Sequence, residues 1–74
     1  MNNHSDKNIR IVDMIFFCEN ALKNDSDSKQ IIDDMLNHKT TEQLKQLFIK
    51  AENRLSIINP DAAFVVRGTI KDCF

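Results

Sequence analysis

Histidine and cysteine are the strongest candidates for acid–base or nucleophilic chemistry in this chain, and each occurs twice. His4 lies in a polar N-terminal segment, and His38 falls at the end of an expected helix. Cys18 belongs to an apolar stretch, where a thiol stays protonated and unreactive, and Cys73 is next to the last residue. Catalysis requires a reactive group, a base and an orienting group that converge in a pocket. The spacing assembles no such set, so we expect a protein that is not an enzyme and has no catalytic residue.

Metal ligation has one faint signal. Asp34 and His38 are four residues apart, a spacing that places two ligands on the same side of a helix. A third ligand is not close in sequence, and a histidine at a helix C-terminus also suits the negative end of the helix dipole. Asp33 and Asp34 point about 100° apart on a helix, which disfavours a catalytic carboxylate pair. The sequence therefore predicts no metal and no cofactor.

Length and composition restrict the class of protein that must position these residues. A chain of 74 residues forms one small domain and buries only about 60% of its unfolded surface. The formal net charge of −1 gives no general attraction to nucleic acid or to an anionic membrane. Two cysteines are too few for a secreted disulfide scaffold, and the polar N-terminus does not resemble a secretory signal. We expect a cytoplasmic protein with reduced cysteines, although Cys18 and Cys73 could still meet in space.

Residues that favour helix N-termini mark four helix starts, so the sequence predicts a small all-α bundle of three to four helices. The expected caps are Ser5 or Asp6, then Asp27, then Thr40 with Gln43 in a capping box, and finally Asn59 with Pro60 at the first helical position. After a flexible tail at residues 1–5, the single domain is expected to contain helices at about 6–23, 28–37, 41–58 and 60–73.

The last segment has a mixed pattern. Ala63, Val66, Ile70 and Cys73 follow helical spacing, yet residues 64–70 are rich in strand-favouring types and include Gly68. The helix start at residues 59–61 and the absence of a partner strand in the sequence favour a helix.

The first helix carries more apolar residues than one buried face needs. Ile9, Val12 and Phe16 lie opposite the main apolar sector of a helical wheel. In the third helix, Ile49 and Ile57 lie off the main stripe. Either the first helix is wrapped by its own chain, or these residues form an intermolecular surface. Because small domains gain stability by oligomerising, we favour a homodimer or a helix that binds a partner.

Charge is distributed unevenly along the chain. Residues 1–37 carry four basic and seven acidic side chains, and residues 38–74 carry six basic and four acidic ones. Lys50 and Arg54 share one side of the third helix, where an ordinary solvated face is the simplest interpretation. A surface with separated charge could also steer a charged protein partner. Direct nucleic-acid binding normally needs a denser basic stripe.

The segment from Glu42 to Leu55 is similar in spacing to the long helix of the Hha-type nucleoid modulators, most closely at residues 51–55. Those are small, all-helical bacterial regulators that act by binding a nucleoid-structuring protein, and related biofilm and stress regulators share a comparable helical hairpin. The resemblance covers under half of the chain. It departs at Phe16 and Phe17, where basic residues are expected, and in the C-terminal segment. It implies that Glu52 and Arg54 contact a partner.

Together these patterns predict a non-enzymatic regulatory or adaptor protein that acts through protein–protein interaction, as a dimer. A secretion-type co-chaperone that shields a helical client is an alternative, and a DNA-binding repressor that uses the basic half is a further one. The expected partner-binding residues combine apolar anchors with a polar rim: Phe16, Phe17, Ile49, Lys50, Glu52, Arg54 and Ile57.

Overall fold

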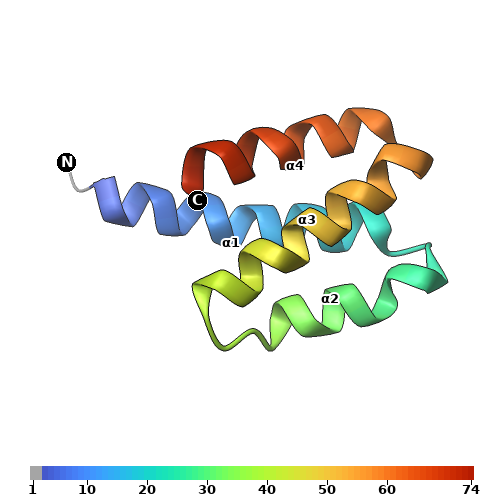
Figure 1. The fold of residues 1–74 in the computed structure, drawn as a ribbon, viewed down its shortest axis with the longest axis horizontal. Coiled ribbons are helices and arrows are strands. Elements are labelled where there is room, and N and C mark those ends of the chain that lie inside the picture. The colour runs from blue at the N-terminus through green and yellow to red at the C-terminus, as the bar shows by residue number, and fades with distance from the viewer. Residues whose placement is uncertain (1–2) are drawn as a thin grey trace.

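The computed structural model describes residues 3–74, with side chains from residue 8 onward, and this part of the chain is all-α (Figure 1). The prediction of an all-α fold is confirmed, and the ambiguous C-terminal segment is a helix. A short 3-10 turn precedes the second helix. The elements are α1 at Asn3–Leu22, η1 at Ser26–Ser28, α2 at Lys29–Leu36, α3 at Thr41–Ile58 and α4 at Pro60–Cys73.

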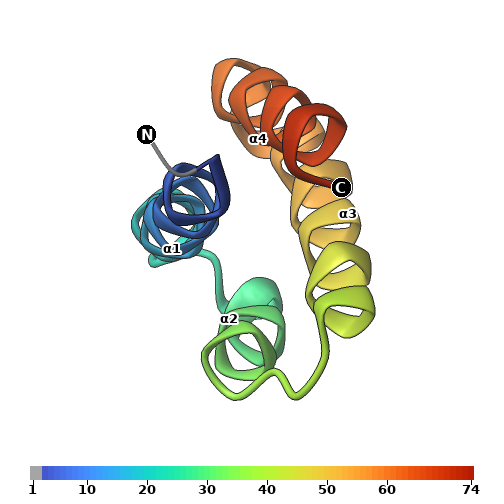
Figure 2. The same ribbon diagram turned by 90° about the vertical axis from the view of Figure 1, so that its left-hand side faces the viewer.

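The four helices form two hairpins that pack against each other. In the end-on view of Figure 2, α1, α2, α3 and α4 surround a common centre. The α3–α4 pair has the most extensive contact, and α1 packs on both α2 and α4. In Figure 1, α1 and α4 run in opposite directions, and the first turns of α1 extend past the end of α4. Each short connection reverses the direction of the chain between sequential helices. After three reversals, the fourth helix runs opposite to the first.

The core receives one apolar face from each helix. Cys18 of α1, Met35 of α2, Phe48 of α3 and Val66 of α4 are all completely buried. Their neighbours along each helix recur at three- and four-residue intervals, the spacing that keeps side chains on one face. At the C-terminus, Phe74 packs edge-to-face on Phe48, with ring centroids 5.8 Å apart, and this contact fixes the end of α4 against α3.

Two of the predicted helix starts are confirmed in detail. Thr40 Oγ1 accepts a hydrogen bond from the Gln43 backbone N–H at 3.0 Å. The Gln43 side chain returns to the backbone N–H of Lys39 rather than to that of Thr40. Asn59 accepts from the Ala62 N–H at 3.3 Å, and Pro60 occupies the first turn of α4.

The other two predicted caps are wrong. Helix α1 begins at Asn3, so Ser5 and Asp6 lie inside it; residues 3–5 of the expected tail are helical, and residues 1–2 lie outside the described part. Asp27 falls within η1, and Ser28 takes the N-cap position of α2 without a side-chain cap hydrogen bond. The Ser28 hydroxyl instead donates to the Asp25 carboxylate at 2.5 Å. That bond closes the turn and leaves Ser28 fully buried.

Candidate interaction surface

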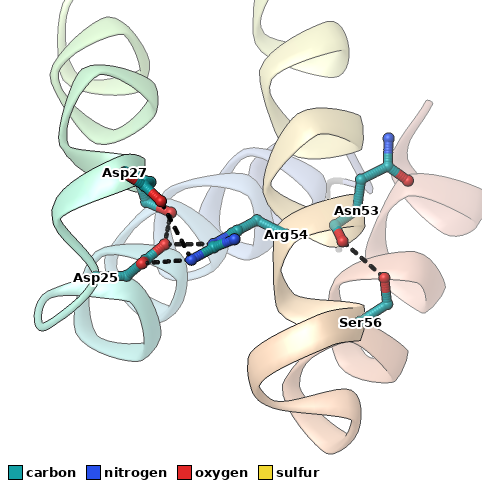
Figure 3. A network of polar contacts seen from close by, with 6 residues as sticks. Asp25, Asp27, Asn53, Arg54 and Ser56 are labelled. Carbon is teal, nitrogen blue, oxygen red and sulfur yellow. Dashed lines mark hydrogen bonds and ion pairs between the residues drawn. The ribbon is translucent and has the colours of Figure 1, made fainter.

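Arg54 of α3 joins the two hairpins through the turn that follows α1 (Figure 3). Its Nε donates to Asp25 Oδ2 at 2.7 Å, and its terminal nitrogen donates to Asp25 Oδ1 at 2.8 Å. This fork-to-fork geometry is the strongest form of the ion pair. Asp27 Oδ2 lies 3.5 Å from the same terminal nitrogen. The Arg54 guanidinium is therefore already paired with carboxylates of its own chain.

The electrostatics of Asp25 follow from this geometry. Hydrogen bonds from Arg54 and then from Ser28 hold the pKa of the Asp25 carboxyl at about 2, below its ordinary value of 3.8. The same carboxylate raises the pKa of Arg54. Both groups are therefore ionised at neutral pH, and the contact between α3 and the turn is an ion pair.

Glu52 and Arg54, the two residues that the resemblance assigns to partner binding, are both held in ion pairs within the chain. Glu52 Oε2 lies 3.6 Å from a terminal nitrogen of Arg67 on α4. The Glu52 side chain is only 19% exposed, and that of Arg54 is 31% exposed. A partner that used either charge would have to compete with these contacts.

Large apolar side chains remain exposed in two groups. The first, which we call the corner patch, surrounds the turn between α3 and α4 and consists of Ile57, Ile58, Phe64 and Val65. Ile57 and Phe64 are each 73% exposed, more than any other large apolar residue in the described part. The second group, the α1 stripe, consists of Ile9, Val12 and Phe16. Leu36, at the end of α2, is exposed by itself.

Five of the predicted partner-binding residues, the four apolar anchors and Lys50 of the rim, are exposed or half-buried. Phe16, Lys50 and Ile57 are exposed. Phe17 is half-buried because it packs against the core, and Ile49 is half-buried as well. These residues come from different helices: Phe16 belongs to α1 and Ile57 to the end of α3.

Sequence reasoning missed Phe64 and Val65. The signal was present in the spacing of Ala63, Val66 and Ile70, which places Phe64 on the outer side of a helix. A helical wheel for residues 62–74 identifies it once that segment is assigned to a helix. The burial pattern of α4 matches that wheel, because the residues that face inward are Ala62, Ala63, Val66, Thr69 and Cys73.

The side chains that could act as nucleophiles or metal ligands do not form a reactive site in the described part of the chain. Burial raises the pKa of the Cys18 thiol to about 12, so this sulfur is not a nucleophile at neutral pH. Within the described residues, no three histidine, cysteine or acidic side chains are grouped as metal ligands. Asp34 accepts a hydrogen bond from Gln30, while His38 Nδ1 lies 2.8 Å from the carbonyl oxygen of Met35. Their sequence spacing therefore does not produce a shared site.

A cavity of about 350 Å³ lies where α1 ends and α2 begins. Leu22 and Ile32 provide its apolar lining, and charged side chains of both signs surround them. Of the helices in the described part, none has both the length and the apolar character needed to cross a membrane.

Comparison with known proteins found no match to a family description, to a curated protein or to a solved structure.

Proposed function

We propose that this chain is a non-enzymatic regulatory or adaptor protein that acts through protein–protein contact, as a homodimer. The observation that carries the protein contact is the corner patch, where Ile57 and Phe64 are each 73% exposed on either side of one turn. Large apolar side chains that a small protein leaves exposed are typical of protein contact sites. Each such side chain contributes about 1.5–3 kcal/mol when a partner covers it completely.

The chain itself holds the two helices that carry the corner patch. The Asn59 cap and Pro60 fix the start of α4, and Leu55 and Ala63 anchor the two helices in the core on either side of the turn. A preformed site avoids much of the entropy that a flexible segment loses on binding. This supports an apolar anchor site for a folded partner or for a helix of a partner.

Polar residues near the corner patch in sequence could form the rim of a contact. Asn53 is exposed one turn before Ile57, Asp61 is exposed between the two halves of the patch, and Arg67 is 62% exposed about one turn beyond Phe64. The rim residues expected from the sequence have different roles: Lys50 is exposed one turn further along α3, whereas Glu52 and Arg54 serve internal contacts.

Affinity purification from cells that naturally produce the chain tests this function. The wild-type chain should retain a specific protein, and Ile57→Asp and Phe64→Asp should each weaken binding of that purified protein by at least tenfold in calorimetry. Leu36→Asp is the matched control, because it makes the same apolar-to-acidic change at an exposed residue at the end of α2, outside the corner patch. Unchanged binding by both apolar-to-acidic variants would overturn the proposal.

A further inference from the structure

We propose that two copies of this chain associate by antiparallel pairing of their α1 helices, with the two Val12 side chains at the two-fold axis. This inference rests on the dimer of the proposed function and assigns it a surface. The corner patch, on α3 and α4, then remains available to a different protein.

The α1 stripe has the spacing of a helix-pairing seam. Ile9, Val12 and Phe16 are separated by three and then four residues, the spacing of the seam positions in a coiled coil. They are 58%, 48% and 57% exposed, on the side of α1 opposite the buried Cys18 and Leu22. The stripe is therefore free along its whole length to accept a second helix.

The stripe is self-complementary when the second helix is reversed. With the axis beside Val12, Ile9 of one copy lies level with Phe16 of the second copy at both ends of the contact. The smaller valine at the centre lets the helices approach, and the larger residues fill the ends. A two-fold interface requires this kind of reciprocity, and antiparallel helices also align their dipoles favourably.

The charges beside the stripe identify a second copy as the occupant. Arg10 and Asp13 lie about one turn apart on the flank that turns toward α4, where Arg10 binds Asp72 of its own chain at 3.2 Å. That contact uses one of the five guanidinium N–H groups, and the Arg10 side chain is 51% exposed. Asp13 is exposed as well. Reversal of the second helix brings Arg10 of each copy beside Asp13 of the other copy. The same flank of α1 therefore contributes both the cation and the anion of each intermolecular ion pair.

The size of the stripe sets the expected strength. Three apolar side chains per copy, with two ion pairs along one flank, fall at the small end of specific interfaces, where association is transient. We expect a dissociation constant on the order of 10 µM.

Sedimentation velocity over a concentration series tests the surface. The wild-type chain should pass from monomer to dimer, and Val12→Glu, which places two carboxylates at the axis, should raise the dissociation constant more than tenfold. Leu36→Glu is the matched control, because it makes the same kind of change at a residue of similar exposure, 49% against 48% for Val12, outside both the stripe and the corner patch. A wild-type chain that is monomeric at millimolar concentration, or a Val12→Glu variant that dimerises normally, would overturn the proposal.

Charge exchange tests the pairing of the flanks. Asp13→Arg should weaken the dimer, because it places two arginines together, and the double variant Arg10→Asp with Asp13→Arg should restore it. Asp72→Asn removes only the intrachain contact and should leave the dimer intact. Failure of the double variant to recover, with circular dichroism showing a folded chain, would rule out this pairing.

Cross-linking tests the direction of the helices. Val12→Cys should form an intermolecular disulfide on mild oxidation, since the two positions meet at the axis. Ile9→Cys should not, because its two copies would lie about 10 Å apart along the helices. Both native cysteines are buried, so the wild-type chain provides the background. Cross-linking of both variants would indicate parallel pairing and contradict the proposal.

Failure of this inference is distinguishable from failure of the proposed function. If the inference is correct, Val12→Glu removes self-association and retains the partner at the corner patch, whereas Phe64→Asp does the reverse. Self-association that is lost in Phe64→Asp and kept in Val12→Glu would place the dimer contact at the corner patch and overturn the α1 assignment.

Discussion

Arg54 donates two parallel hydrogen bonds, of 2.7 and 2.8 Å, to the carboxylate of Asp25, although the two residues are 29 positions apart in sequence. The pair joins α3 to the turn between α1 and α2, and it is the best-formed polar contact between the two hairpins in the described residues. We expect it to hold the two hairpins together.

Removal of this contact should destabilise the fold. Arg54→Ala leaves the Asp25 carboxylate, which is only 14% exposed, without its principal donor. We expect the melting temperature to fall by several degrees, whereas Arg67→Ala, which removes the longer and more exposed Glu52 contact, should have a much smaller effect. Equal effects of the two substitutions would contradict a structural role for the bidentate pair.

Acid should weaken the same contact in a defined window. Because the pKa of Asp25 is lowered from 3.8 to about 2 in the folded chain, its stabilising contribution is fully present above pH 5. The contribution declines as pH falls through 4 and is lost near pH 2, because the unfolded carboxyl takes up its proton first. Urea unfolding at pH 7 and pH 3 should show a smaller difference for Asp25→Asn than for the wild-type chain. An identical pH dependence would exclude this assignment.

Gly68 offers a stabilising substitution. It is exposed in the interior of α4, with a φ outside the positive range, and an added Cβ would meet no atom within 4 Å. Gly68→Ala should therefore raise the free energy of unfolding by about 0.5–1 kcal/mol through helix propensity. Chemical denaturation measures this directly, and a destabilised variant would contradict a regular helix at this position.

Two phenylalanines should respond in opposite ways to truncation. Phe48 is completely buried and packs on Phe74, so Phe48→Ala should cost about 3–5 kcal/mol, enough to unfold many domains of this size. Phe64 is 73% exposed, and Phe64→Ala should change stability by less than about 0.5 kcal/mol. Circular dichroism during thermal melting distinguishes them, and a large loss on truncation of Phe64 would show that it supports the fold.

Cys18 should be protected from alkylation in the folded chain. Burial raises the pKa of its thiol to about 12, so almost none is thiolate at pH 8, and reagents cannot reach a side chain with no exposed surface. In the variant Cys73→Ser, where Cys18 is the remaining thiol, iodoacetamide should react slowly without denaturant and rapidly in urea. Fast reaction in both conditions would indicate that α1 opens readily.

Local signals in the sequence determined most of the helices. Thr40, Asn59 and Pro60 mark the starts of α3 and α4 because a cap acts through groups within three residues of it. The same reasoning failed at Ser5, Asp6 and Asp27. There the polar side chains fit a cap, but the chain continued the helix or used Asp25 and Ser28 to close a turn.

Periodicity determined which faces are apolar, but only the tertiary structure decided which of them are covered. A 3.6-residue repeat fixes the angle between Phe16 and Phe17 on α1, whereas the positions of α2 and α4 decide that Phe17 packs inward and Phe16 stays exposed. The role of Arg54 is the clearest case. Its sequence context indicates a solvent-facing helix position, and its partner Asp25 becomes a neighbour only when two hairpins pack. Contacts between residues that are distant in sequence depend on how whole helices are arranged, which the residues near either partner do not encode.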